Sequence, residues 1–420
     1  MSPFNLEACA RPNILALQPY RCARDDYKDD GQNILLDANE NAFGPSLPSA
    51  LSAAGQDLGV DLLGLHRYPD PHQHDLKQLL CNLRNTHAHT PKVLTPEHMF
   101  VGVGSDEAID ALLRCFCVPG KDRILTCPPT YGMYAVSAQV NDVGIFKVPL
   151  LPAPDFSLDV PAITAALSSE PDLKLVYICS PGNPTGSLVA KSDVEQILRH
   201  PTWNGVVVLD EAYIDFAPED ASLAELVTEY PNLVVMQTLS KAFGMAGIRL
   251  GAAFTSPEIA LLLNNLKAPY NISSPTSALA SYAVSDKGLA IMRENRASIL
   301  AQRDRLIQEL PKVPGVGRLR GGTMSNFLLY EMLDAQGNPD NVTALAVYEK
   351  LAESRGVVVR FRGKEHGCLG CLRITVGTEQ EVTRFLESLR KTLAEVRRVP
   401  DSVDAAVEEQ KENEASNIVA

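Results

Sequence analysis

The sequence predicts an α/β protein with a mostly parallel seven-stranded sheet covered by helices on both faces, and a smaller α+β domain built from both chain ends. Short β-branched runs alternate with longer amphipathic segments in the middle of the chain, a pattern typical of βαβ units. The runs are continuously apolar, as in strands that are buried on both faces. The length of 420 residues allows two or three domains, each large enough to bury a core.

Seven segments of this middle region are candidate strands, at residues 100–103, 123–127, 143–148, 173–179, 206–209, 233–237 and 250–254. A covering helix is predicted over residues 106–117, where four apolar residues recur at positions i, i+3, i+4 and i+7. Ser105 is placed to cap its first turn. The apolar stripe of this helix can pack on the sheet.

The flanks of the chain have a different pattern. Strand-like pieces at 34–36, 327–330, 357–360 and 372–376 lie among helices near 291–310 and 341–355. We therefore divide the chain into an N-terminal arm and part of the small domain (1–66), a large domain (67–290), the rest of the small domain (291–398) and a tail (399–420). Residues 401–420 carry six acidic residues and one Lys without apolar periodicity, so we expect a disordered tail.

Composition excludes several classes of function. Lys and Arg number 38 against 51 Asp and Glu, a formal charge of -13, which repels a phosphate backbone and argues against a nucleic-acid partner. No apolar run reaches the length that a membrane helix needs. The nine cysteines are irregularly spaced, as expected for free thiols in a reducing cytoplasm, and no metal-binding spacing is recognisable.

The segments that follow the predicted strands are candidate ligand-binding loops, because ligands of open α/β sheets bind at the carboxyl ends of strands. Residues 102–107 form a small-residue turn that opens a helix, which suits a phosphate but also fits a plain helix cap. Residues 180–186, Ser-Pro-Gly-Asn-Pro-Thr-Gly, form a rigid turn from which Asn183 projects. An ordinary turn asparagine is the alternative there.

Two further loops carry charge. Asp210 begins the segment Asp-Glu-Ala-Tyr directly after a buried strand, and a buried carboxylate needs a cation or a proton opposite it. Lys241 follows the next strand, close to Ser240 and to Arg249. A lysine at a strand end is often only a solvated charge, but here it lies among small residues.

Together the four loops supply a phosphate cradle, an amine, a buried carboxylate and a planar amide. Pyridoxal phosphate needs a lysine for its aldehyde, an anion for its ring nitrogen, hydrogen bonds to its ring oxygen and a phosphate site. Asn183 and Asp210 are 27 residues apart, and Asp210 and Lys241 are 31 apart. Each interval is about one helix plus one strand, so the three side chains could converge at one sheet edge.

The segments 180–186, 210–213 and 240–244 with Arg249 resemble the fold-type I, aspartate-aminotransferase-like family of pyridoxal phosphate enzymes. Within it the chain is most similar to the histidinol-phosphate aminotransferases, through residues 11–14, 36–41, 67–71, 127–134 and 371–377. The resemblance covers residues 11 to 395. Relatives that act on phosphothreonine or aromatic amino acids share much of this pattern.

The resemblance implies a role for each cofactor-binding residue. Lys241 would bind the cofactor aldehyde and move the substrate proton, and Asp210 would keep the ring nitrogen protonated. Asn183 and Tyr213 would donate hydrogen bonds to the ring oxygen, and Tyr131 would stack on the ring. The phosphate would be held by Ser105, Asp106, Ser240, Arg249 and, from a second subunit, Tyr68. The last assignment requires a homodimer with shared sites.

Substrate binding is assigned to the small domain. Arg373 matches the family's arginine for the substrate carboxylate or phosphate, and Arg360 matches its second anion position. Arg362 is an equally placed competitor, and a surface strand arginine is the alternative for Arg360. Tyr20 and Asn39 occupy motif positions near the substrate.

The resemblance implies a transaminase that interconverts histidinol phosphate and 2-oxoglutarate with imidazole acetol phosphate and glutamate, in histidine biosynthesis. One alternative is a related aminotransferase or decarboxylase for another aromatic or phosphorylated amine. A binding protein without turnover is a further alternative, but it would be expected to have lost the lysine, which is present as Lys241.

Overall fold

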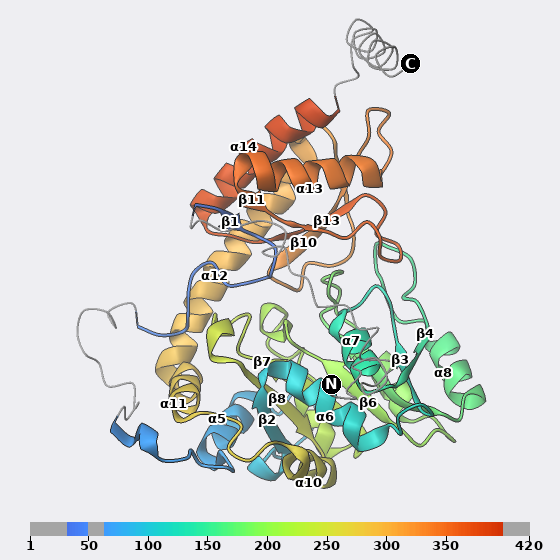
Figure 1. The fold of residues 1–420 in the computed structure, drawn as a ribbon, viewed down its shortest axis with the longest axis vertical. Helices are drawn as coiled ribbons and strands as arrows, with labels where there is room; N and C mark the ends of the chain where they lie inside the picture. Colours follow the sequence, from blue (N-terminus) through green and yellow to red (C-terminus); the bar gives the residue numbers. More distant parts are fainter. Residues whose placement is uncertain (1–31, 49–62, 398–420) are drawn as a thin grey trace, which may run out of the picture.

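The computed structural model describes residues 32–48 and 63–397 (Figure 1). One part of the molecule contains a large sheet with its covering helices, and the other contains smaller sheets beneath α13 and α14 (Figure 1). The long helix α12 (Asp286–Glu309) runs from one part to the other. The division into domains at residues 66, 290 and 398 stays a prediction, and the acidic tail lies outside the described residues.

The central sheet has seven strands in the order β2-β8-β7-β6-β5-β3-β4, and only β8 runs antiparallel to its neighbours. The strands are β2 (Met99–Val103), β3 (Arg123–Thr126), β4 (Gly144–Lys147), β5 (Leu173–Cys179), β6 (Val206–Asp210), β7 (Leu233–Thr238) and β8 (Leu250–Thr255). All seven predicted strands are confirmed, each within one residue at either end. The mostly parallel α/β fold is confirmed with them.

Both faces of this sheet are buried, as the continuous apolar runs predicted. Val207 and Val208 are neighbours on β6, and their side chains belong to two different core clusters, because successive side chains of a strand point to opposite faces. Helices α6, α7 and α10 supply the cluster of Val208. Helices α5, α8 and α9 pack on the other face.

The helices of this part are α5 (His74–Arg84), α6 (Gly104–Phe116), α7 (Met133–Val140), α8 (Val160–Ser169), α9 (Lys191–Leu198), α10 (Pro257–Leu266) and α11 (Ser274–Ala283). Short 3-10 helices span Leu63–His66, Pro96–His98, Ile214–Phe216, Ala224–Thr228, Ala246–Ile248 and Leu310–Lys312. None of the described helices is long and apolar enough to cross a membrane.

The prediction that Ser105 caps α6 is wrong. The helix begins at Gly104, two residues before the predicted start, and no side chain accepts a capping hydrogen bond at its N-cap residue, Val103. Gly104 has a φ of +73°, a conformation that glycine adopts without strain, and the carboxylate of Glu107 reaches back to accept from the N–H of Val103. Ser105 therefore lies within the first turn of the helix.

The smaller antiparallel sheet has the order β12-β13-β10-β9. Its strands are β9 (Val316–Leu319), β10 (Phe327–Met332), β12 (Arg360–Phe361) and β13 (Cys371–Thr375), and α13 (Asn341–Arg355) and α14 (Glu379–Val396) accompany it. β1 (Ile34–Leu35) pairs in parallel with β11 (Val357–Val358). A segment near the start of the described chain therefore pairs with one from its C-terminal part, as predicted from the flanking segments.

Two details differ from the sequence prediction. The predicted strand 357–360 is divided into β11 and β12, which pair with β1 and β13 respectively. β9 was not predicted, because Val-Gly-Arg-Leu is short and contains a glycine and a charge, which weaken the strand signal.

Candidate active site

A cavity of about 320 Å³ lies where the carboxyl ends of the central strands meet the small sheet. It brings together nearly all predicted site residues that the structure describes: Asn39, Ser105, Asp106, Tyr131, Asn183, Asp210, Tyr213, Ser240, Lys241, Arg249, Arg360 and Arg373, together with the competitor Arg362. Tyr68 does not line it, and Tyr20 lies outside the described residues.

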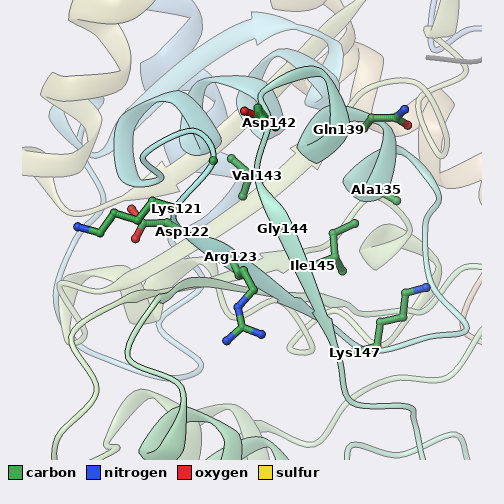
Figure 2. A pocket seen from close by; sticks show the side chains of 11 residues that line it. Lys121, Asp122, Arg123, Ala135, Gln139, Asp142, Val143, Gly144, Ile145 and Lys147 are labelled. Atoms are coloured by element: carbon green, nitrogen blue, oxygen red, sulfur yellow. The ribbon is translucent and has the colours of Figure 1, made fainter. Parts of the chain in front are cut away.

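A larger cavity of about 760 Å³ lies beside the edge strand β4 and contains none of the predicted site residues (Figure 2). Its charged side chains include Lys121 and Lys147, which extend to opposite sides (Figure 2), and Arg123, whose Nε lies 2.6 Å from Oδ2 of Asp172. This cavity is an open hollow on the surface, and its lysine side chains do not point toward a common centre (Figure 2). The size of a cavity alone therefore does not locate the active site.

Asp210 ends β6 inside the smaller cavity and is only 2% exposed. Its Oδ2 accepts a hydrogen bond from the Tyr134 hydroxyl at 2.6 Å, and its Oδ1 accepts one from the N–H of Ala212 at 3.2 Å. Burial raises the pKa of Asp210 to about 6, although both hydrogen bonds favour the carboxylate. A buried anion of this kind is suited to a cationic ring nitrogen.

Tyr134 is a functional candidate that the sequence analysis missed. It is fully buried on α7, its ring stacks on Tyr177 with centroids 4.8 Å apart, and it makes an edge contact with Tyr131 at 5.6 Å. The only sequence signal was its position three residues after Tyr131, in the loop that leads into α7 (Met133–Val140).

Lys241 follows β7 and reaches into the same cavity, where its Nζ donates to the carbonyl oxygen of Ala38 at 3.0 Å. Burial, together with the positive charge of Arg373, lowers the pKa of Lys241 to about 8. A substantial fraction of the amine is therefore neutral near physiological pH, as required of a nucleophile that bonds to an aldehyde.

Asn183 and Tyr213 form a pair of hydrogen-bond donors. The Oδ1 of Asn183 accepts from Nη1 of Arg373 at 2.7 Å, and the Tyr213 hydroxyl accepts from Nδ2 of Asn39 at 2.9 Å. Their acceptor atoms are thus engaged, and within residues 32–48 and 63–397 no acceptor contacts the amide N–H groups of Asn183 or the hydroxyl proton of Tyr213. Both groups can donate to one oxygen of a bound ring.

The first turn of α6 forms the anion-binding end of the cavity with Ser240 and Arg249. A Cβ on Gly104 would lie 2.5 Å from Nη2 of Arg249, and one on Gly251 would lie 2.3 Å from the backbone nitrogen of Ser105. Only glycine therefore allows this close approach. A helix N-terminus beside a guanidinium is a suitable place for a phosphate.

The residues present thus fit pyridoxal phosphate. Three observations support this: the buried carboxylate of Asp210, the amine of Lys241 with its lowered pKa, and a glycine-lined cradle that a Cβ would fill. The side chains that would hold the ring and the phosphate come from loops at one edge of one sheet, as the sequence predicted. Their individual roles stay predictions.

Tyr68 lies apart from this cavity. It is 82% exposed and stacks on Tyr270 with centroids 4.6 Å apart. Within one subunit it therefore does not complete the phosphate site.

The fold and the cavity define an aminotransferase of the pyridoxal-phosphate-dependent type. The family model "Aminotransferase class I and II" matches residues 32–389, and the histidinol-phosphate aminotransferase of Schizosaccharomyces pombe is 52% identical over 93% of this chain and 98% of its own length. The chain belongs to this family, and within it to the histidinol-phosphate aminotransferases. Its cofactor is pyridoxal phosphate.

Other relatives agree with this placement. The histidinol-phosphate aminotransferase of Candida maltosa is 51% identical over 94% of this chain and 99% of its own length. The crystal structure of histidinol-phosphate aminotransferase from Sinorhizobium meliloti, in complex with pyridoxal-5'-phosphate, superposes with a TM-score of 0.78 at 25% identity and covers 93% of this chain and 98% of that one.

Proposed function

We propose that the chain catalyses amino-group transfer between L-histidinol phosphate and 2-oxoglutarate, giving imidazole acetol phosphate and L-glutamate, in L-histidine biosynthesis. The observation that carries this proposal is one cavity that contains the lysine and carboxylate of a pyridoxal phosphate site together with Arg249 and three arginines of the small-sheet side, Arg360, Arg362 and Arg373. Relatives named for this reaction, with about half of their residues identical over nearly their full length, support it.

Bound pyridoxal phosphate supplies an electrophilic aldehyde and a ring that withdraws electrons from the substrate Cα. Lys241 would hold the cofactor through its Nζ and, with the substrate bound, would take the proton from the substrate Cα. Its lowered pKa of about 8, caused chiefly by burial, keeps the released amine basic and leaves about half of it uncharged near pH 8.

Asp210 holds a proton on the ring nitrogen, with Tyr134 fixing the orientation of its carboxylate. Asn183 and Tyr213 donate to the ring oxygen, and Tyr131 packs against the ring face. The backbone N–H groups of Ser105 and Asp106, with Ser240 and Arg249, bind the phosphate.

Arg373 and Arg360 bind the anionic groups of the substrates. They lie opposite one another on β13 and β12, and Arg373 is fixed by Asn183 and by the carbonyl of Asp37. A guanidinium can bind a carboxylate or a phosphate through two parallel hydrogen bonds. One pocket can thereby accept both a phosphate monoester and a dicarboxylate.

We also propose a cytoplasmic homodimer in which Tyr68 completes the phosphate site of the other subunit. The exposure of Tyr68 and its stacking on Tyr270 support this arrangement. The cysteines among the described residues are free thiols, which supports a reducing compartment.

Glutamate formation tests the catalytic proposal. Purified holoenzyme with histidinol phosphate and 2-oxoglutarate should form glutamate, and Lys241→Ala should form none while remaining folded by circular dichroism. Absence of glutamate with the wild-type enzyme, or turnover by Lys241→Ala at the wild-type rate, would contradict the proposal.

Mixing two inactive variants tests the shared site. Subunits with Tyr68→Ala and subunits with Lys241→Ala should regain activity when they are dissociated and reassociated together, because each mixed dimer contains one intact site. Random pairing restores about a quarter of the wild-type sites. If mixed dimers form but no activity is recovered, the proposal that the two subunits share each active site would be contradicted.

A further inference from the structure

Three arginines lie on one face of the small sheet and line the cavity. Arg360 is paired with Arg373 across β12 and β13, and the N–H of Arg362 donates to the carbonyl of Cys371 at 2.9 Å, which extends the pairing beyond β12. Side chains along a strand alternate between faces, so Arg360 and Arg362 share a face. Phe361, between them, packs against the core instead, and all three arginines line the cavity.

Arg362 carries its own counter-ion. Its Nη1 lies 2.6 Å from Oε1 of Glu365, and the two side chains are 22% and 27% exposed. The N–H of Glu365 donates to the carbonyl of Arg362 at 3.0 Å, so a tight turn holds the pair together. Nε of Arg362 and Oε2 of Glu365 are buried without a hydrogen-bond partner among the described residues. The pair therefore leaves hydrogen-bonding capacity unused.

The charges of Arg362 and Glu365 also affect the pKa of Arg373. The pKa of Arg373 is lowered to about 9, chiefly by burial. The charge of Arg362 contributes to this lowering more than that of Arg360 does, and Glu365 opposes it. Arg362 is thus the stronger electrostatic neighbour of Arg373, and Glu365 offsets part of its charge.

We propose that Arg362 determines specificity for the distal anion of the substrate and that Glu365 sets how much negative charge this anion must carry. The inference rests on the proposed function and deepens it. When a substrate carboxylate displaces Glu365 from Arg362, the arginine exchanges one singly charged partner for another and gains no electrostatic attraction. A phosphate monoester brings a charge near -2 and three acceptor oxygens, so it gains from the exchange. Discrimination of this kind comes from a competing group as much as from an attractive one.

Steady-state kinetics of the holoenzyme, with histidinol phosphate or glutamate as the amino donor, test the proposal. Arg362→Gln should raise the KM for histidinol phosphate about tenfold, the effect of losing one hydrogen bond to a charged group, with little change in kcat. The KM for glutamate should change much less, and Arg362→Lys should recover part of the loss. Glu365→Gln should lower the preference for histidinol phosphate over glutamate, chiefly through a lower KM for glutamate.

Lys312→Gln is the matched control. Lys312 and Glu309 form an ion pair with the same i, i+3 spacing at 2.8 Å, away from the cavity. This variant should leave both KM values unchanged. An unchanged ratio of the two specificity constants in Arg362→Gln and Glu365→Gln, with both variants folded, would overturn the proposal, as would an equal change in the control.

Binding of unreactive ligands separates this inference from the proposed function. Glycerol phosphate and glutarate are titrated into wild-type and Arg362→Gln holoenzyme by calorimetry, and only glycerol phosphate should bind more weakly to the variant. If wild type fails to convert histidinol phosphate but this difference is found, the proposed substrate falls and the role of Arg362 stands. If wild type converts it and glycerol phosphate binds both proteins equally, the role of Arg362 falls.

Discussion

Tyr134→Phe should make the enzyme lose activity at a higher pH than wild type as the solution is acidified. The substitution keeps the ring that stacks on Tyr177 but removes the hydroxyl that donates to Oδ2 of Asp210 at 2.6 Å. Asp210 must be ionised to hold a proton on the cofactor ring. Burial already raises its pKa to about 6, and the Tyr134 hydrogen bond opposes this rise.

The magnitude follows from the strength of that bond. A hydrogen bond to a charged group contributes about 1.5–3 kcal/mol, and about 1.4 kcal/mol corresponds to a tenfold change in proton affinity. Loss of the hydroxyl should therefore raise the proton affinity of Asp210 at least about tenfold. Since activity is lost as pH falls through the pKa of Asp210, the acidic limb should move upward by about one pH unit or more.

The assay is the pH dependence of kcat with saturating substrates and cofactor, with Tyr177→Phe as the control. Tyr177 is also fully buried, but its hydroxyl donates to the backbone carbonyl of Ile109 at 3.3 Å rather than to Asp210. The control should keep the wild-type midpoint even if it is less stable. An unchanged limb in Tyr134→Phe, or an equal shift in both variants, would refute the reasoning.

Three further predictions concern the cofactor site and its support. Asp210→Asn should slow turnover by about a hundredfold or more, because a neutral amide cannot stabilise a cationic ring nitrogen; steady-state kinetics with excess cofactor check this, and a near-normal rate would contradict it. Gly104→Ala should weaken cofactor affinity at least about tenfold, because the added Cβ would lie 2.5 Å from Nη2 of Arg249 at a φ of +73°. Equilibrium titration of apoenzyme measures this, and unchanged affinity would show that the cradle tolerates a side chain. Arg84→Met should lower the free energy of unfolding by about 3 kcal/mol, because it removes the guanidinium that lies 2.8 Å from the Asp215 carboxylate. The side chains of this ion pair are only 10% and 11% exposed, so the remaining carboxylate would be buried without its partner. Urea unfolding of the holoenzyme tests this prediction, and an unchanged midpoint would contradict it.

Local sequence patterns predicted the central sheet because each strand is an uninterrupted apolar run, as in residues 206–209. The same patterns could not give the strand order, in which β8 lies between β2 and β7 and runs antiparallel to both. That arrangement depends on contacts between distant segments. β9 was not predicted because it is an edge strand with a glycine and an arginine, which have a weak intrinsic preference for strands. It forms a strand because it packs within the folded sheet.

The site residues on strand ends were predictable for a related reason. Asp210 and Lys241 each follow a buried strand, so topology alone brings them to one edge. The role of Tyr134 was not predictable, because its contact with Asp210 joins residues 76 positions apart and depends on how α7 packs. Arg360 and Arg362 could not be separated, because they are two residues apart and both line the cavity.

The central claim is that this aminotransferase acts on histidinol phosphate, and a single-turnover experiment tests it most directly. Holoenzyme is mixed with histidinol phosphate, phenylalanine or phosphothreonine without a keto acid, and the loss of the cofactor's visible absorbance is followed by stopped flow. Histidinol phosphate should convert the cofactor far faster than either competitor at equal concentration. Faster conversion by phenylalanine or phosphothreonine would contradict the account.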